Sequence, residues 1–433
     1  MLLTGMNIPD MSLPRVVIVG GGFAGLSVAR ALSGTKFQVV LLDKHNYHTF
    51  QPLLYQVATA GLEPDAIAFP IRKIFKKHQN FFFRMTEVKS VSPEKNTLHT
   101  SIGSLVYDHL IIASGSKTNY FGIAGMEEQS MSMKSIPEAL NLRSLILQNF
   151  ERALLSSELE KQRSLMSFVI IGAGPTGVEL AGALGELKTH VLAKDYPDLD
   201  LRKMQIHLIE AAPRVLAPMD PVSSAKAAQY LKELNVNIWV DTTVKDVKGN
   251  KVYTNSDKVF ETDNIIWTAG VIGAAIDGLD DALTKPNRIE VNEYNQVKGH
   301  TNIYALGDVA QMNTPSTPKG HPMLAQVAIQ QGNLLAKNLT NATLGKPLKA
   351  FKYNDLGSMA TIGRNRAVVE LPKFKFQGLF AWYVWMFVHL VSLVGFRNRV
   401  IVLINWIWNY VNYDRGIRLI IRPFKREIPN GNE

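Results

Sequence analysis

The sequence of 433 residues contains no cysteine. This absence excludes structural disulfides, thiolate metal ligands, iron–sulfur clusters and electron relays through a redox-active cysteine pair. The ten histidines show no H-E-x-x-H or similar spacing, so no metal site is predicted. Residues 1–14 lack a basic start followed by an apolar run, and no secretory signal is expected there.

Long uncharged apolar runs are scarce, and only one approaches the length of a membrane span. Residues 379–396 read LFAWYVWMFVHLVSLVGF, with a possible charge only at His389. As a helix this run would measure about 27 Å, and residues 400–411 (VIVLINWIWNYV) would measure about 18 Å. The hydrocarbon core of a bilayer is about 30 Å thick. The first run could barely span it and the second cannot, and a span would carry Arg397 and Arg399 across against the positive-inside tendency.

The C-terminal region instead has the pattern of a helix that lies flat in a lipid interface. The second run carries a polar stripe at Asn405, Asn409 and Asn412, spaced i, i+4 and i+7 on an otherwise apolar helix. From Thr361 onward there are eleven basic and four acidic residues, most of the net charge of +10. We therefore predict monotopic attachment to an anionic lipid surface and no nucleic-acid partner. The alternative is that the two runs form an internal helical hairpin or a homodimer interface. Either arrangement is compatible with membrane attachment.

Two copies of one dinucleotide-binding pattern stand out among the residues that are present. Each is an apolar run, then Gly-x-Gly-x-x-Gly, then a helix-like segment, with glycines at 20, 22 and 25 and again at 172, 174 and 177. The first glycine permits the tight turn, the second lets the backbone approach a pyrophosphate, and the third lets the helix pack on the strand. A single such motif is weak evidence, but two in the right context predict two nucleotide sites.

An acidic residue is expected at the end of the next strand, where it would bind ribose hydroxyls. Asp43 fills that place in the first copy and Glu210 in the second, with an insertion around 188–203. A carboxylate repels a 2′-phosphate, so Glu210 predicts NADH over NADPH at the second site. Arg214 lies close enough in sequence to weaken this prediction.

The repeat extends beyond the glycines. Residues 107–115 (YDHLIIASG) resemble residues 262–270 (TDNIIWTAG), at nearly the same distance from the first glycine of each copy. One nucleotide-binding plan has therefore been used twice, which predicts an α/β fold with two Rossmann-like dinucleotide-binding domains. Two nucleotides on one chain suggest that one donates electrons and the other holds them.

With these motifs the chain resembles the type II NADH:quinone oxidoreductases, the alternative, non-proton-pumping NADH dehydrogenases. The resemblance covers nearly the whole chain and rests on both glycine motifs and on further segments at 46–58, 174–182, 304–308, 325–331, 396–399 and 405–406. It implies a glutathione-reductase-like flavoprotein in which FAD occupies the first site and NADH the second. It also implies a bacterial membrane protein that delivers electrons to a quinone.

The resemblance implies an FAD domain at 1–120 and 286–345, an NADH domain at 121–285 and a C-terminal membrane-association region at 346–433. The implied FAD contacts are Gly20, Gly22, Gly25, Asp43, Lys44, Gln51, Val88, Ser114, Gly115, Asp308 and Gln326. The implied NADH contacts are Gly172, Gly174, Gly177, Glu179, Glu210, Ala269 and Gly270.

Three residues are candidates for a role in the chemistry. Glu179 follows Gly177 by two residues and would orient or balance charge near the two reacting rings; alternatively it merely favours a helix N-terminus. Gln326 and Gln330 share one helix face and, by resemblance, would contact the quinone; alternatively they form an ordinary polar face. Because only His389 lies within the long apolar run, turnover is expected to be non-electrogenic at the cytoplasmic face of the inner membrane.

Two other functions remain open from the sequence. One is a reductase of a protein electron carrier, which would have no use for the apolar C-terminal region. The other is a membrane-held redox sensor, in which reduction of a flavin changes partner binding. Disulfide reductases and sulfide:quinone oxidoreductases are disfavoured because both need cysteines.

Overall fold

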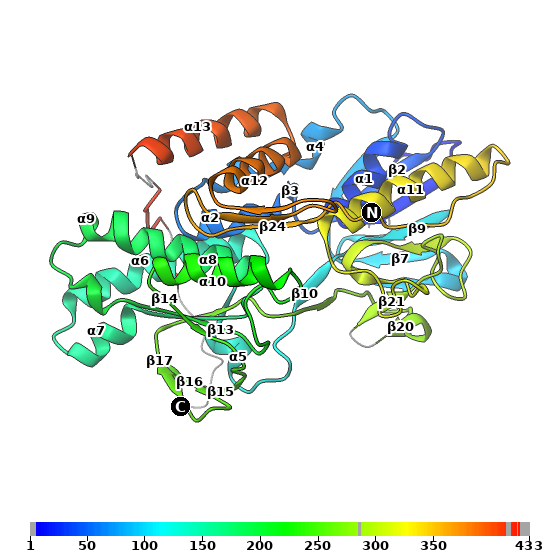
Figure 1. The fold of residues 1–433 in the computed structure, drawn as a ribbon. Coiled ribbons are helices and arrows are strands. Elements are labelled where there is room, and N and C mark those ends of the chain that lie inside the picture. Colours follow the sequence, from blue (N-terminus) through cyan, green and yellow to red (C-terminus); the bar gives the residue numbers. More distant parts are fainter. Residues whose placement is uncertain (1–5, 285–286, 413–416, 422, 425–433) are drawn as a thin grey trace. The chain divides into compact units, whose positions relative to one another are not determined.

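The computed structural model describes residues 6–284, 287–412, 417–421 and 423–424 (Figure 1). Within these ranges the chain packs as two compact units. Unit 1 comprises described residues of Met1–His48, Ala68–Lys117 and Val271–Asp355, and unit 2 comprises those of Thr49–Ile67, Thr118–Gly270 and Leu356–Glu433. The grouping differs from the expected segments, since 49–67 and the C-terminal region pack with the second glycine motif. The assignment of segments to particular nucleotides stays a prediction.

Unit 1 is built around a parallel five-stranded sheet of order β22-β9-β1-β2-β5. Its strands are Ile303–Ala305, His109–Ile112, Arg15–Val19, Gln38–Asp43 and Phe81–Met85. Two helices, α1 (Phe23–Leu32) and α11 (Ala325–Thr343), pack against each other in this unit. Two smaller sheets complete it: β6 (Val88–Ser92), β7 (Thr97–Thr100) and β8 (Gly103–Val106), then β20 (Leu283–Thr284), β21 (Arg288–Glu290) and β23 (Ala310–Gln311).

Unit 2 repeats this plan with the order β11-β18-β12-β13-β14. The strands are Met131–Ser132, Asn264–Trp267, Ser167–Ile171, Gln205–Ile209 and Val236–Trp239. The longer helices are α6 (Ile136–Leu155), α8 (Pro175–Leu187) and α10 (Pro221–Glu233). A small antiparallel sheet follows, made of β15 (Val244–Lys248), β16 (Lys251–Thr254) and β17 (Val259–Glu261).

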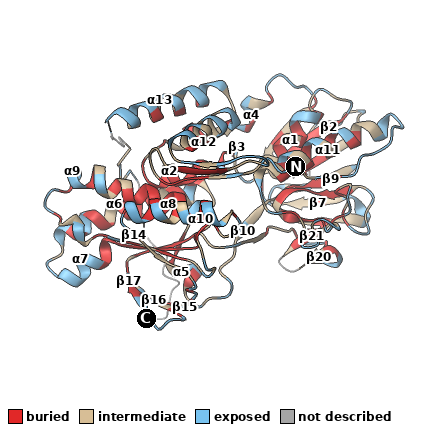
Figure 2. Ribbon diagram, viewed as in Figure 1, coloured by how far each residue is buried: buried red, intermediate tan, exposed pale blue. Residues whose placement is uncertain are grey.

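The two sheets match strand by strand around their glycine motifs. In unit 1 the motif strand β1 lies between β2 and β9, and in unit 2 the motif strand β12 lies between β13 and β18. The residues of both central strands are buried except Arg15, as expected for parallel strands covered on both faces (Figure 2). The structure therefore confirms the predicted α/β fold with two Rossmann-like halves.

The C-terminal part of unit 2 begins with an antiparallel sheet of β24 (Ser358–Thr361), β25 (Ala367–Glu370) and β26 (Lys375–Gln377), which packs against α8, α10 and α12. Two helices follow, α12 (Leu379–Ser392) and α13 (Phe396–Asn412). Figure 1 shows α13 running along the outer side of α12. No helix within the described ranges combines the length and apolar character needed to cross a membrane.

These helices differ in length from those that the apolar runs predict. The run at 379–396 is not one helix, because α12 ends at Ser392 and Gly395 adopts a left-handed conformation (φ +87°). The next helix begins at Phe396 rather than Val400. Its first turn includes Asn398, whose side chain is buried and hydrogen-bonded to the protein. The expected basic residues Arg415, Arg422, Lys425 and Arg426 lie outside the described residues.

The remaining elements are short. The helices are α2 (Leu54–Ala58), α3 (Pro64–Ile67), α4 (Ile71–Ile74), α5 (Met126–Gln129), α7 (Leu159–Leu165) and α9 (Ala193–Asp195), and a π-helical turn spans Lys188–Leu192. The strands are β3 (Tyr47–Thr49), β4 (Ala68–Pro70), β10 (Ser116–Thr118) and β19 (Val271–Gly273).

Candidate functional site

The first glycine loop connects β1 to α1 in unit 1. A Cβ atom on Gly20 would lie 2.3 Å from the carbonyl oxygen of Ala113, and Gly20 has φ +101°. A Cβ on Gly25 would lie 1.9 Å from the carbonyl oxygen of Gly20. By contrast, a Cβ on Gly22 would meet nothing within 4 Å. The outer two glycines are thus required by the fold, while the middle one borders open space at the start of α1.

The second loop, between β12 and α8 in unit 2, has the same three environments. Gly172 has φ +103° and its Cβ would lie 2.7 Å from the backbone of Ala269, and a Cβ on Gly177 would lie 1.9 Å from Gly172 O. Gly174 again borders open space. Pro175 occupies the first turn of α8, where its missing N–H costs nothing. In both units, a helix N-terminus and open space at the middle glycine meet the geometric needs of a bound phosphate.

The two predicted acids hold these loops in the same way. Asp43 accepts from the backbone N–H of Gly21 (2.6 Å) and from that of His45 (2.7 Å). Glu210 accepts from the N–H of Ala173 (2.6 Å) and from that of Ala212 (2.8 Å). Each carboxylate therefore joins the glycine loop to the end of the neighbouring strand, which is where a ribose would lie.

Arg214 does not compete with Glu210 in this structure. Its guanidinium donates to the carbonyl oxygens of Ala217 (2.7 Å) and Met219 (3.1 Å), within its own loop. This favours the predicted preference for NADH, because the guanidinium is already engaged away from a 2′-phosphate.

The other implied FAD contacts are spread over unit 1, with one exception. Ser114 and Gly115 follow β9, and the Ser114 hydroxyl donates to Ala274 O (2.6 Å). Asp308 lies in a short 3₁₀ turn, where the hydroxyl of Ser116 donates to its carboxylate. The remaining members are Lys44 after β2, Val88 at the start of β6, Gln326 on α11 and Gln51, which belongs to unit 2.

The implied glutamine contacts lie at the start of α11. The side chain of Gln330 donates to Asn354 O (2.8 Å) and accepts from Asn354 N (3.0 Å). The neighbouring Gln331, which was not predicted, accepts from Gly307 N (2.7 Å) and fixes the turn that carries Asp308. The assignment of Gln326 and Gln330 to the quinone stays a prediction.

Glu179 is buried in α8, with 7% of its surface exposed. Its carboxyl accepts from the backbone N–H of Thr361 (3.3 Å), at the end of β24. Burial raises its pKa to about 8. The hydrogen bond from Thr361 opposes this rise, as does the nearby indole of Trp385, although the indole N–H does not reach hydrogen-bond geometry. The carboxyl is therefore protonated at neutral pH and can donate a proton.

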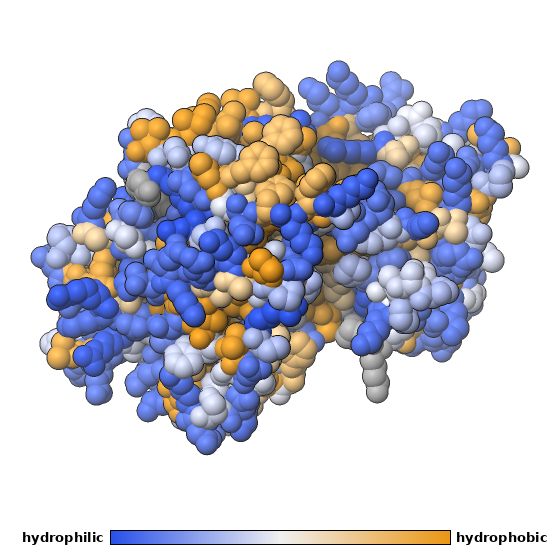
Figure 3. Space-filling model, in the orientation of Figure 1, coloured by the Kyte–Doolittle hydropathy of each residue, from blue (hydrophilic) through white to orange (hydrophobic). Residues whose placement is uncertain are grey.

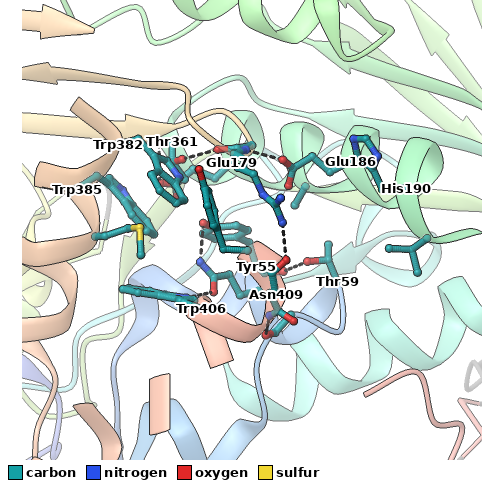
Figure 4. Close-up of a pocket in the computed structure, with 18 residues that line it drawn as sticks. Tyr55, Thr59, Glu179, Glu186, His190, Thr361, Trp382, Trp385, Trp406 and Asn409 are labelled. Atoms are coloured by element: carbon teal, nitrogen blue, oxygen red, sulfur yellow. Dashed lines mark hydrogen bonds between the residues drawn. The ribbon is translucent and has the colours of Figure 1, made fainter. Parts of the chain in front are cut away.

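A pocket of about 120 Å³ lies beside Glu179, entirely within unit 2 (Figure 4). Its wall comes from α2, α8 with the following π-helical turn, the loop after β24, α12 and α13. Three tryptophans line it, at 382, 385 and 406. Trp385 is 2% exposed, and its indole N–H has no hydrogen-bond partner in the described structure. A buried unpaired donor in the wall of an apolar pocket suits a ligand with a carbonyl oxygen.

Trp385 also stacks on His389 one turn further along α12, with 4.0 Å between ring centroids. The Nδ1 of His389 donates to Trp385 O (2.8 Å). Burial lowers the pKa of His389 to about 4, so this ring is neutral at physiological pH. The long apolar segment therefore carries no charge.

Three polar side chains of α13 hydrogen-bond to the protein. Asn398 donates to the carbonyl oxygens of Asp65 (2.9 Å) and Ala66 (3.1 Å) at α3, and the indole of Trp406 donates to Gln56 Oε1 (2.9 Å). Asn409, a member of the predicted polar stripe, donates to Gly61 O (3.1 Å). These bonds hold α13 as one wall of the pocket.

The opposite faces of α12 and α13 expose apolar side chains. They include Phe380, Tyr383, Phe387 and Val391 on α12 and Phe396, Ile404, Ile407, Trp408 and Val411 on α13. Figure 3 shows apolar side chains gathered over these helices. We call these nine residues the apolar face. An exposed apolar surface of this kind is rare on soluble monomers and marks a surface that binds a protein or a membrane.

Sequence reasoning identified Glu179 but missed most of the pocket, including Glu186, His190 and Arg364. A signal was available for two of these, because positions 179, 186 and 190 are spaced i, i+7 and i+11 and fall on one helix face. The tryptophans were interpreted as lipid-interface residues, and nothing in their spacing brings Trp385 next to Glu179.

Comparison with known proteins supplies the family. Residues 14–332 match the pyridine nucleotide-disulphide oxidoreductase family, and residues 356–412 match the NDH2 C-terminal domain. Two type II NADH:quinone oxidoreductases of Mycobacterium tuberculosis, Ndh and NdhA, are 34% and 35% identical to the chain. Both alignments cover 93% of this chain, and they cover 89% and 88% of the relatives, respectively.

Solved structures agree on the fold. NDH2 from Plasmodium falciparum, solved in complex with NADH, superposes with a TM-score of 0.86 at 22% identity, covering 94% of this chain and all of that one. The sulfide:quinone oxidoreductase of Aquifex aeolicus gives a TM-score of 0.70 at 21% identity, covering 89% and 92%. Membership of the matched oxidoreductase family implies a flavin cofactor. Two nucleotide-type loops, a C-terminal region of the matching kind and full-length relatives together place this chain in the type II NADH:quinone oxidoreductase family.

Proposed function

We propose that the flavin of this NADH:quinone oxidoreductase is FAD, bound by the first glycine loop in unit 1, and that NADH binds the second loop in unit 2. The open space at Gly22 and at Gly174 fits a pyrophosphate, and Asp43 and Glu210 stand where the two riboses would be. Asp308 would hold the flavin side chain. When bound, the flavin would accept a hydride from NADH and pass two electrons on to the quinone.

The pocket in unit 2 is our proposed site for the quinone headgroup. Its tryptophans offer flat apolar surfaces, the indole N–H of Trp385 offers one donor, and protonated Glu179 offers a proton. The wall formed by α12 and α13 also carries the apolar face on its outer side. A quinone dissolved in the membrane could then enter the pocket from the lipid surface to which the protein binds.

The apolar face is our proposed surface of attachment to the cytoplasmic side of the bacterial inner membrane. Insertion to the depth of one helix would bury the exposed side chains without a span. Arg397 lies on the same helix, 3.9 Å from Asp65, and 62% of its side chain is exposed, so that it could also contact anionic lipid. Turnover would move no charge across the membrane, because α12 contains no charged side chain, its His389 being neutral, and none lies in the apolar part of α13.

The single observation that carries this assignment is the unpaired, buried indole N–H of Trp385 beside Glu179. Its test is a Trp385→Phe variant of the full-length protein, assayed with a short-chain quinone and with ferricyanide. We expect the quinone KM to rise about tenfold, the effect of losing about 1.4 kcal/mol of hydrogen bonding. Ferricyanide reduction should stay unchanged.

The matched control is Trp239→Phe, which removes an indole donor to His207 elsewhere in unit 2. This variant should leave both activities unchanged. An unchanged quinone KM in Trp385→Phe, or an equal loss with both acceptors, would argue against the pocket as the quinone site.

A further inference from the structure

Reduction of a quinone needs a proton that NADH does not supply. The quinone takes up two electrons and two protons, whereas the hydride of NADH brings two electrons and the equivalent of one proton. The second proton must come from water, so the overall reaction consumes NADH, one proton and quinone and yields NAD⁺ and quinol. This inference rests on the proposed function, because the second proton must reach the tryptophan-lined pocket that we assign to the quinone.

Six side chains in the pocket wall are titratable or charged. They are Tyr55 on α2, Glu179, Glu186 and His190 on α8 and the turn after it, Arg364 after β24 and Tyr410 on α13. An arginine stays charged, and phenols release protons only near pH 10. Carboxyl and imidazole groups are the usual carriers of protons in proteins, so the candidates are the two glutamates on α8 and the histidine in the turn after it.

These three groups form a line along the pocket. Glu179 and Glu186 are spaced i, i+7 on one face of α8, about 10 Å apart along its axis, and His190 follows in the π-helical turn, where it also lines the pocket. Figure 4 shows Glu179 toward the tryptophans, with Glu186 and His190 farther along α8. Glu179 is buried, while Glu186 and His190 are half-buried and reach the surface. The line thus leads from solvent to the interior.

Two local features hold the outer groups in the wall. The helix changes to a π-helical turn at Lys188–Leu192, a departure that is frequent at functional sites and that here carries His190. The carboxylate of Glu186 accepts from the backbone N–H of Arg364. The guanidinium of Arg364 donates to Asn409 O on α13 and lies 4.7 Å from the ring of Tyr410. The cavity has room for several water molecules, which could bridge the gaps between the three groups.

We propose that His190 and Glu186 form the solvent end of a proton-relay path that leads along α8 to Glu179 and from there to the quinone. In each turnover one proton enters at His190, passes through Glu186 and water to Glu179, and is transferred from the Glu179 carboxyl to a quinone oxygen. Glu179 is then reprotonated along the same line. The electron pair does not travel on this path.

The test measures the rate at which quinone reoxidises the NADH-reduced flavin in a single turnover, with His190→Ala and Glu186→Gln variants of the full-length protein. We chose Gln at position 186 because it keeps an oxygen that can accept from Arg364. We expect this rate to fall about tenfold or more in each variant, most strongly at alkaline pH where protons are scarce. The solvent deuterium isotope effect should increase, and added imidazole should restore the rate of His190→Ala.

Ferricyanide takes up electrons without protons, so its reduction should be unchanged in both variants. Lys194→Gln, an exposed residue one turn beyond His190 and outside the pocket wall, serves as the control and should match the parent protein. Unchanged reoxidation rates in both variants, or a rate loss that imidazole does not restore and that ferricyanide shares, would overturn the path. In that case a raised quinone KM in Trp385→Phe would still support the pocket, whereas an unchanged KM would overturn both proposals.

Discussion

Glu179 carries a buried carboxyl whose ionisation opposes folding. In an unfolded chain this group ionises near its ordinary pKa of 4.5, but in the folded protein burial keeps it protonated until about pH 8. The folded state therefore binds the extra proton between these pH values. Its contribution to stability is fully present below pH 4.5 and is lost as pH rises toward 8.

We predict that Glu179→Gln removes this pH dependence, since glutamine resembles the protonated acid and can still accept from Thr361. Relative to the variant, the free energy of unfolding of the parent protein should fall by about 1.4 kcal/mol per pH unit between about pH 4.5 and 8. Urea titrations at several pH values would measure this difference. If the free energies of unfolding of the two proteins changed with pH in the same way, the Glu179 carboxyl would be ionised in the folded protein, contrary to this prediction.

At the residue scale the sequence predicts groups whose role is local. The glycine motifs fix the positions of Asp43 and Glu210, because a strand, a turn and a helix bring each acid back to its own loop. Trp385 could not be predicted in the same way. Its environment depends on α8, α12 and β24 packing together, and the sequence spacing of three segments contains no information about such packing.

At the scale of elements, α12 and α13 are helices as their apolar character predicts, but their ends and faces depend on tertiary contacts. The helix break at Ser392 and the early start at Phe396 follow from a left-handed glycine and from the anchoring of Asn398. Of the polar stripe expected at 405, 409 and 412, Asn409 lies on an inward face together with Asn398 and Trp406, whereas Asn412 is exposed. Hydrogen bonding to the protein, rather than hydropathy alone, sets which side is exposed.

For α13 we predict that Ile404→Lys combined with Ile407→Lys abolishes membrane binding without affecting folding. Both side chains are more than half exposed, so the melting temperature should change little. Each substitution removes about 1.5 to 3 kcal/mol of apolar insertion, which corresponds to at least a tenfold weaker binding per site. Cosedimentation with phosphatidylglycerol-containing vesicles measures the change.

The control for this experiment is Leu155→Lys, a substitution at the exposed end of α6, where the leucine is 88% exposed and not part of the apolar face. It should sediment with vesicles like the parent protein. If the double variant on α13 also sedimented normally, the apolar face would have to be an interface with protein, such as a second copy of this chain.

At the scale of the whole molecule, the internal repeat predicts more than any single motif. Two parallel sheets with matching strand order follow from the paired patterns at 107–115 and 262–270. The grouping of 49–67 with the C-terminal helices does not follow from the repeat, because it arises from contacts such as Trp406 with Gln56, which join residues 350 positions apart. The sequence therefore predicts single members of the pocket formed there, such as Glu179, but not the pocket as a whole.

The central claim is that this chain passes electrons from NADH through a bound flavin to a quinone. The most direct test is an anaerobic visible spectrum of the purified full-length protein, first alone, then with NADH, then with ubiquinone or menaquinone. We expect a flavin spectrum that NADH bleaches and that at least one quinone restores, with FAD released on denaturation. A folded protein that stays colourless after incubation with FAD, or a flavin that NADH bleaches and neither quinone reoxidises, would contradict the account.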